Sequence, residues 1–433
     1  MLSIDELDAV YFNNDSKVLL SALRQFPIAA FLAYKTVVTK AIDDIKPGDS
    51  FNADIFKTYS DNFSGIINIT LSGDKYALKR SELLLNVNRF AAYKTHHATT
   101  QIARQWADKD AVAREPKQYK EAAKRVANKF NRYQVAEYNT ATARARTAKQ
   151  WIDFTSDETR MELYPNLKWL PSRSVEQRPE HVEFYGTIRP KNDPFWNENQ
   201  PGNLWQCKCD WEETDEGSTG TPKRKASAQQ GLEGNPGEEY KYEHGQHSGV
   251  IFTNNSVYFK AKPAATVESA ILNAPETGWF NVNPKVKCHV LHGQNEIAGN
   301  MQVLDAFVAT RNNVKSIKLL PNITGDNLKL KPNFYPEGFT SRGKASNADA
   351  VITFDNGDTW VADIKAMKGT GSKLNHRLND AYQQADFAII KILGVEHKSV
   401  QQTAETFIKK HPMFKGLIII NNSNTVIYEF IRQ

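Results

Sequence analysis

Two aspartates and a lysine in the last third of the chain have the spacing of a divalent-cation site. Asp363 and Lys365 stand two residues apart in an apolar run that predicts a strand, so their side chains share one face. An Asn-Gly turn at residues 356–357 predicts a hairpin that places this strand beside the segment after Asp349. Carboxylates bind Mg²⁺, and a lysine orients an attacking water or stabilises charge on a phosphate. Glu296, on a predicted preceding helix, is a fourth candidate ligand.

The elements around these residues decide whether they meet. A structural interpretation is also open, because an exposed Asp363–Lys365 pair would be only a weak surface ion pair. From residue 284 onward the apolar spacing alternates between helical and strand patterns, which predicts an α/β domain with a mixed sheet and flanking helices. The expected helices are Glu296–Thr310, Leu374–Ala385 and Val400–Lys410, and the expected strands are Val314–Leu320, Ala350–Phe354, Thr359–Ala366, Phe387–Leu393, Leu417–Asn421 and Thr425–Ile431.

Three residues in the middle of the chain have the chemistry of zinc ligands. Cys207 and Cys209 offer thiolates and His181 offers an imidazole, although C-x-C is tighter than the usual C-x₂-C. Asp210 and His244 are weak candidates for a fourth ligand. The alternative is a buried cysteine pair in an aromatic core, with the histidine satisfied by hydrogen bonds. The chain has only three cysteines, too few for a disulfide framework, which favours a reducing compartment.

Length and charge limit the number of domains and the class of protein that we expect. The chain has 433 residues, 40% apolar and 24% charged, which predicts two or three domains. No run approaches the roughly 20 uncharged apolar residues that cross a bilayer, and the acidic start does not resemble a secretory signal, so we expect a cytoplasmic product without a membrane span. The net charge of +6 is concentrated in residues 104–149, where the spacing predicts a long, basic, exposed helix. That helix is either a solvated scaffold or a contact for DNA phosphates.

Composition divides the chain into four parts. Residues 1–134 predict a helical region, including a helix from Asp15 to Ile45, and residues 135–211 an irregular module rich in proline and tryptophan. Residues 212–283 are rich in Gly, Ser, Thr, Pro and charge, which predicts a flexible linker with short strands. Residues 284–433 form the α/β domain. The fold class expected is therefore multidomain, helical and irregular first and α/β last.

The motifs of the last domain resemble a nuclease family. Asn347-Ala348-Asp349-Ala350, Ala362-Asp363-Ile364-Lys365 and a helix carrying Gln383-Gln384-Ala385 are similar to the PD-(D/E)XK nucleases. More narrowly, they resemble the C-terminal toxin domains of contact-dependent inhibition proteins, several of which cleave tRNA. The resemblance covers residues 284–433 and implies a restriction-endonuclease-like fold. It assigns Glu296, Asp349 and Asp363 to metal binding and Lys365 to catalysis, with alanine where the family name has proline.

The same resemblance suggests residues that face the substrate. Gln384 would do so from the helix after the second strand, and Asn375, His376 and Arg377 from the start of that helix. Lys368 lies in the intervening loop, where its ammonium would contact phosphates. The alternative for all five is a solvated loop and helix surface.

A second resemblance lies in the middle of the chain. Arg178-Pro179-Glu180-His181, then Asn192-Asp193-Pro194-Phe195-Trp196 and Trp205-Gln206-Cys207-Lys208-Cys209, occur in the order typical of the phage Mu F-like minor head proteins, the head-morphogenesis family. In that family the domain sits with the portal inside the capsid and contributes to assembly or the passage of DNA. The resemblance implies portal and capsid proteins as partners and the capsid interior as location.

Together these features predict a phage or prophage minor head protein that carries a toxin-like nuclease into the host cytoplasm. The nucleic acid cleaved is expected to be tRNA, with other RNA and DNA as open alternatives, and the sequence does not decide whether an immunity protein accompanies it. One competing hypothesis is a metal-independent RNase of the barnase–colicin type, with His289, His292 or His376 as acid and base. Another is a catalytically inert head protein that binds DNA and the portal.

Overall fold

The computed structural model describes residues 11, 37–174, 177–220, 222, 228–243, 246–261, 264–343, 345–369, 372–394 and 399–432. The chain forms two compact units, Met1–Ile271 and Leu272–Gln433. Most of the predicted helix Asp15–Ile45 lies outside the described residues, and residues 37–41 are helical. None of the described helices is both long and apolar enough to cross a membrane.

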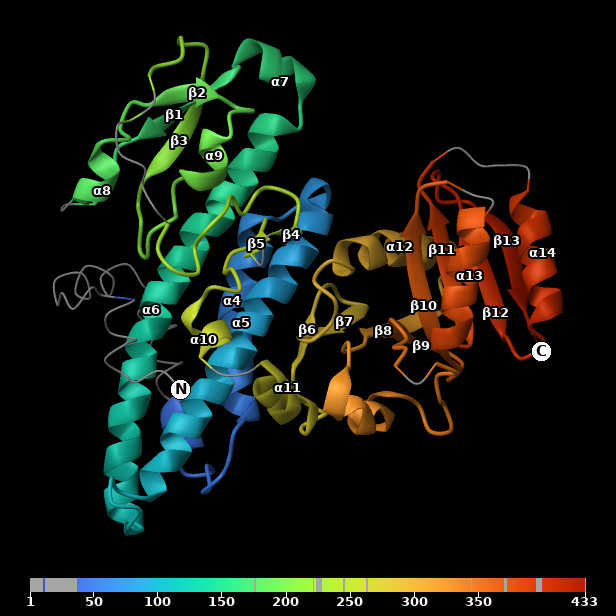
Figure 1. Ribbon diagram of the computed structural model, residues 1–433, viewed down its shortest axis with the longest axis horizontal. Helices are drawn as coiled ribbons and strands as arrows, with labels where there is room; N and C mark the ends of the chain where they lie inside the picture. The colour runs from blue at the N-terminus through green and yellow to red at the C-terminus, as the bar shows by residue number, and fades with distance from the viewer. Residues whose placement is uncertain are drawn as a thin grey trace. The chain divides into compact units, whose positions relative to one another are not determined.

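Three long helices build the N-terminal unit: α4 (Ala53–Thr70), α5 (Ala77–Ala103) and α6 (Pro116–Thr155). They lie side by side (Figure 1). The Asn52 side chain caps α4 by accepting from the backbone of the first turn, and Glu115 begins α6 with a capping box. The predicted helical character of this region is confirmed. The predicted boundary after residue 134 falls inside α6, which continues to Thr155.

A buried ion pair joins α5 to α6. The Lys94 ammonium, fully buried, contacts the Glu137 carboxylate and donates to Gln134 Oε1 at 2.7 Å. The other oxygen of Glu137 accepts from the Tyr258 hydroxyl at 3.0 Å. Burial lowers the pKa of Lys94 to about 8, and the charge of Glu137 opposes that shift. Both charged groups have partners, so the ion pair is neutral and we call this cluster closed, although Gln134 Nε2 has no hydrogen-bond partner among the described residues.

The basic helix predicted for residues 104–149 is only partly exposed. In the first half of α6, Lys117, Lys124 and Arg125 are exposed, whereas Arg144 in the second half is fully buried. Its guanidinium donates to the carbonyls of Leu232, Gly234 and Val250 at 2.8–3.1 Å. Here the structure differs from the sequence prediction, because backbone carbonyls rather than water solvate this charge.

These contacts also change the interpretation of the predicted linker. Leu232, Val250 and Phe252 are buried, and the Asn86 amide exchanges two hydrogen bonds with the Phe252 backbone. The sequence predicted a flexible linker here. The described residues from 228 to 271 belong instead to the folded N-terminal unit. A few apolar anchors and two buried polar side chains hold a segment whose composition resembles a linker. Its elements are β4 (Lys241–Glu243), β5 (Gln246–Ser248), α10 (Val257–Lys260) and α11 (Ala264–Leu272).

The tryptophan-rich stretch folds around a small antiparallel sheet. Strands β1 (Asn166–Leu170), β2 (Ile188–Pro190) and β3 (Asp210–Thr214) pair in the order β2-β1-β3. Trp169, Trp196 and Trp211 are buried in one cluster beside the end of α6. The short helices are α7 (Glu158–Leu163), α8 (Pro179–Val182) and α9 (Phe195–Glu198).

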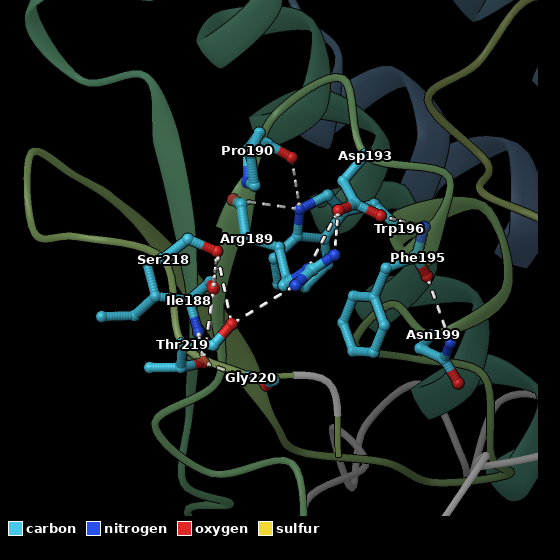
Figure 2. Close-up of polar contacts among 10 residues, drawn as sticks. All are labelled: Ile188, Arg189, Pro190, Asp193, Phe195, Trp196, Asn199, Ser218, Thr219 and Gly220. Atoms are coloured by element: carbon cyan, nitrogen blue, oxygen red, sulfur yellow. Dashed lines mark hydrogen bonds and ion pairs between the residues drawn. The ribbon is translucent and has the colours of Figure 1, made fainter. Parts of the chain in front are cut away.

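The Asp-Pro-Phe-Trp motif of this module has a structural role (Figure 2). Asp193 accepts from the Phe195 backbone at 2.8 Å and forms an ion pair with Arg189 at 2.6 Å. The Trp196 indole donates to the Pro190 carbonyl at 3.0 Å while its ring enters the core. The motif thus closes the turn after β2 and begins α9.

The C-terminal unit is a mixed eight-stranded sheet in the order β13-β12-β11-β10-β9-β8-β7-β6. Helices α13 and α14 pack over β11 and β12, and α12 packs against β10 and β11. The predicted α/β class is confirmed, and so are the predicted helices and strands to within two residues at each end. The elements are β6 (Trp279–Asn281), β7 (Val286–His289), α12 (Ile297–Thr310), β8 (Val314–Leu319), a 3₁₀ segment (Gly325–Phe334), β9 (Ala350–Phe354), β10 (Thr359–Met367), α13 (Ser372–Gln384), β11 (Phe387–Ile392), α14 (Val400–Lys410), β12 (Gly416–Ile420) and β13 (Val426–Ile431).

Candidate functional site

The hairpin of β9 and β10 brings Asp349, Asp363 and Lys365 together. The strands are antiparallel with Ala350 opposite Ala362, so Asp349 lies beside Asp363 on the neighbouring strand. The Lys365 ammonium donates to Asp349 Oδ2 at 3.0 Å and to Asp363 Oδ1 at 2.8 Å. The Ile364 backbone donates to the same Asp349 oxygen at 2.7 Å. Both carboxylates therefore converge on one point at this end of the hairpin.

The charges of this cluster do not balance. Two carboxylates face one ammonium, and Asp363 is fully buried. Burial, and then the charge of Asp349, raise the pKa of Asp363 to about 7. Burial alone would lower the pKa of Lys365, but the two carboxylates more than offset it and raise that pKa. Asp363 Oδ2 has no hydrogen-bond partner among the described residues, so the cluster has an oxygen and negative charge to offer a further cation.

Gln384, the last residue of α13, also reaches the cluster. With its amide nitrogen turned toward the acceptors, it donates to Asp363 Oδ1 at 3.0 Å and to the Asn347 carbonyl at 2.6 Å. Arg342 holds the end of this helix, because its guanidinium donates to the carbonyls of Tyr382 at 2.9 Å and Ala385 at 2.7 Å. Arg342 belongs to no spaced motif, so its role could not be predicted from the sequence.

Glu296 is not joined to the two aspartates by any hydrogen bond or ion pair of the described residues. It stands immediately before α12, and its carboxylate lies against the backbone of Gly293. A Cβ atom on Gly293 would collide with Glu296 Oε2, so the Glu296 side chain folds back over its own turn.

The other predicted substrate contacts lie on the surface. His376 Nδ1 donates to Asp380 Oδ2 at 3.0 Å, and Arg377 approaches the same carboxylate at 3.8 Å. Asn375 is exposed in the first turn of α13, and Lys368 is exposed directly after β10. Within the described part of the chain, none of the four has a hydrogen bond to Asp349 or Asp363.

The histidines of the metal-independent alternative are placed differently from one another. His292 is buried, with its ring nitrogens 2.7 Å from the Leu320 carbonyl and 3.1 Å from the Asn300 amide. His289 is also buried and packs edge-on against Trp279, while His376 is exposed. The two buried rings are engaged by the core of the unit.

A second cluster lies in the tryptophan-rich module of the N-terminal unit. His181 Nδ1 is 3.5 Å from Cys207 Sγ and 3.3 Å from Cys209 Sγ. The other ring nitrogen bonds Asn203 Oδ1 at 3.0 Å, which directs the Nδ1 lone pair toward the sulfurs. This arrangement could hold a metal ion. Asn203, outside any predicted motif, was missed from sequence.

The two predicted candidates for a fourth ligand do not complete this group. The Asp210 carboxylate accepts from Gln150 at 2.9 Å and Arg173 at 3.1 Å, and His244 lies outside the described residues. The two thiols contact each other and shift each other's pKa in opposite directions. Hydrogen bonding from Cys209, and then His181, lower the pKa of Cys207 against the opposing effect of burial, while Cys207 raises the pKa of Cys209.

Comparison with known proteins finds no match: no family model, no curated protein and no solved structure is significantly similar to this chain.

Proposed function

We propose that the C-terminal unit is a Mg²⁺-dependent nuclease with a restriction-endonuclease-like fold. One observation carries the proposal: Asp363 Oδ2, buried in a cluster of two carboxylates and one ammonium, has no hydrogen-bond partner in the part of the chain that the structure describes. An unpaired buried carboxylate oxygen is costly unless a cation or donor reaches it. Mg²⁺ takes oxygen ligands and commonly uses one or two carboxylates together with substrate phosphates.

The residues then have separate roles. Asp349 and Asp363 hold the ion, which when bound polarises a phosphoryl oxygen and activates water. Lys365, fixed by both aspartates, orients the attacking water and stabilises the developing charge. The water oxygen forms a bond to phosphorus and gives up a proton to solvent, while the ester P–O bond breaks and the departing oxygen takes a proton from solvent. Gln384 fixes the Asp363 carboxylate in place, and Glu296 would act through water or after its side chain turns.

The order of motifs supports a wider proposal for the whole chain. In it the N-terminal unit is a phage or prophage minor head protein that lies with the portal inside the capsid, and the C-terminal unit is delivered into the host cytoplasm. The nucleic acid cleaved is tRNA in the first instance, because the resemblance is to toxins several of which act on tRNA. Exposed bases of α6, such as Lys117 and Lys124, would contact nucleic-acid phosphates. An immunity protein for the toxin-like domain would be a further partner.

The ion of the N-terminal unit is zinc in this proposal. Two thiolates and an imidazole are ligands that favour zinc over magnesium, whose ligands are oxygens. The hydrogen bond from His181 to Asn203 is the kind of outer contact that orients a ligating histidine.

The test is cleavage by the purified full chain. Labelled tRNA, another structured RNA and duplex DNA are incubated with the protein in Mg²⁺, in excess chelator, and in chelator overcome by added Mg²⁺. We expect tRNA cleavage that disappears with chelator and returns with the metal. Cleavage that survives chelation would favour the metal-independent RNase, and intact nucleic acids in every arm would favour an inert head protein.

A further inference from the structure

We infer that the metal at His181, Cys207 and Cys209 keeps an open coordination position, which an oxyanion from outside the fold occupies. The inference rests on the proposed zinc ion and goes beyond it. Structural zinc sites close with four protein ligands, whereas sites that bind an external ligand have three. Among the described residues this group has three members, all within 4.8 Å of one another.

The group lies at a small hollow that is partly open to solvent. All three ligands line it, so an ion bound there would be reached from the hollow. The other lining residues are the cations Arg178 and Lys208, the hydroxyl-bearing Ser172 and Ser174, the Gln206 amide and the Tyr185 ring. Such a wall offers hydrogen-bond donors and positive charge to an anion.

Arg178 is held in place at this wall. Its guanidinium donates to the Trp205 carbonyl at 2.6 Å, which leaves other N–H groups of the fork for a ligand. Arginine binds carboxylate and phosphate with two parallel hydrogen bonds. The chemistry therefore selects an oxyanion, a carboxylate or a phosphate, rather than a neutral molecule.

The loop that carries the cysteines is strained. Gln206, directly before Cys207, has a φ of 62°, in the left-handed region that non-glycine residues seldom adopt. Its backbone N–H donates to the Thr140 hydroxyl at 2.8 Å, and its amide reaches the Tyr11 carbonyl at 3.5 Å. Strain of this kind persists only where neighbours enforce it, and it concentrates at functional sites. α6 thus holds the strained Gln206 next to the first thiolate.

The experiment begins with the metal content of the full chain. We expect about one zinc per chain, lost in Cys207→Ser and kept in Cys288→Ser, which changes a buried cysteine of the other unit. Zinc is then replaced by Co²⁺, whose visible spectrum reports the ligands. Inorganic phosphate and acetate are titrated separately, which distinguishes the two sources of oxyanion. We expect a saturable shift of the visible bands with at least one, and an affinity about tenfold weaker in Arg178→Gln with the metal retained.

Each contrary result would overturn a different part of the proposal. A wild-type chain without stoichiometric metal would overturn the zinc proposal and this inference together. If the metal binds but neither anion shifts the visible bands, the open coordination position alone is overturned. A changed spectrum in anion-free Tyr185→Phe would mean that the tyrosine fills the fourth position, which also overturns it. None of these outcomes bears on the C-terminal nuclease, so the two proposals fail separately.

Discussion

Lys94 in the N-terminal unit is paired with one carboxylate and Lys365 in the C-terminal unit with two, so the two clusters differ in net charge and in the oxygens left to bind a ligand. Lys94 and Glu137 are fully buried and neutral as a pair, and the remaining glutamate oxygen accepts from Tyr258. Lys365 instead faces two aspartates, so one negative charge is in excess when Asp363 is ionised, and Asp363 Oδ2 has no hydrogen-bond partner among the described residues. The Lys365 side chain also keeps 19% of its surface exposed, where that of Lys94 keeps none.

The comparison teaches that residue type does not identify a functional site. A buried ion pair whose two charged groups both have partners serves the fold, because removing one partner leaves the other charge buried and uncompensated. A cluster with an unsatisfied oxygen and access to solvent retains capacity for a ligand. Similar mutations in the two clusters should therefore change different properties: stability in the Lys94 cluster and cleavage in the Lys365 cluster.

The largest effect is expected in the closed cluster. Glu137→Ala leaves the Lys94 ammonium buried without its counter-charge, which should lower the free energy of unfolding of the N-terminal unit by about 3–5 kcal/mol. Urea unfolding of the full chain, followed by tryptophan fluorescence, measures it. The double variant Lys94→Met, Glu137→Leu removes both charges and should recover much of the loss. A Glu137→Ala variant as stable as the wild type would show that this ion pair does not stabilise the fold.

In the open cluster the loss should appear in catalysis. Lys365→Ala should reduce cleavage by roughly 10²–10³-fold, since it removes the group that stabilises charge in the transition state. Its stability should change little, because Asp363, with a pKa of about 7, takes up a proton when the ammonium is gone.

Lys391 provides the matched control for that variant. It lies on the neighbouring strand, opposite Ala366, and donates to Asn424 at 2.6 Å rather than to the aspartates. Lys391→Ala should keep its cleavage rate under the same conditions. Equal losses in the two variants would show that Lys365 has no special role.

A smaller effect is expected from Gln384. Gln384→Ala removes one neutral hydrogen bond to Asp363 and should slow cleavage about tenfold. The rate measured over a range of Mg²⁺ concentrations distinguishes its role: a loss that excess metal repairs indicates positioning of the metal ligand. A loss independent of metal would assign Gln384 to the substrate instead.

The smallest effect concerns a third, more exposed cluster. Burial opposes ionisation of Asp153, but hydrogen bonds from Lys149, Lys75 and Tyr76 prevail and lower its pKa to about 2. The folded pKa lies below the ordinary 3.8, so this stabilisation is present above pH 3.8 and is lost as the pH falls toward 2. Asp153→Asn should cost about 1 kcal/mol at pH 7 and nothing near pH 2, by urea unfolding at both. A difference in the free energy of unfolding that is the same at both pH values would refute this prediction.

Local patterns predicted most of the C-terminal unit. The Asn-Gly turn set the register of β9 and β10, and this register alone places Asp349 beside Asp363. The irregular module was harder, because strands as short as β2 have too few residues to show a period. The folded segment after residue 228 depends on the buried guanidinium of Arg144, a contact that spans 88 residues to Leu232.

The candidate site was predictable only in part for the same reason. Spacing within one hairpin predicted the meeting of Asp363, Lys365 and Asp349. It gave no information on where the Glu296 side chain turns or on what Arg342 holds, because those depend on loop geometry and distant contacts. The open coordination position inferred at His181, Cys207 and Cys209 likewise depends on a hollow lined by separate segments.

The most direct measurement is the position of a bound divalent cation. Crystals of the full chain are soaked in Mn²⁺ at a concentration that supports cleavage, and anomalous scattering locates the ion. The account predicts a peak roughly 2.0–2.6 Å from oxygens of both Asp349 and Asp363, absent in Asp363→Asn. Manganese at other sites alone, with no peak between the two aspartates, would contradict it.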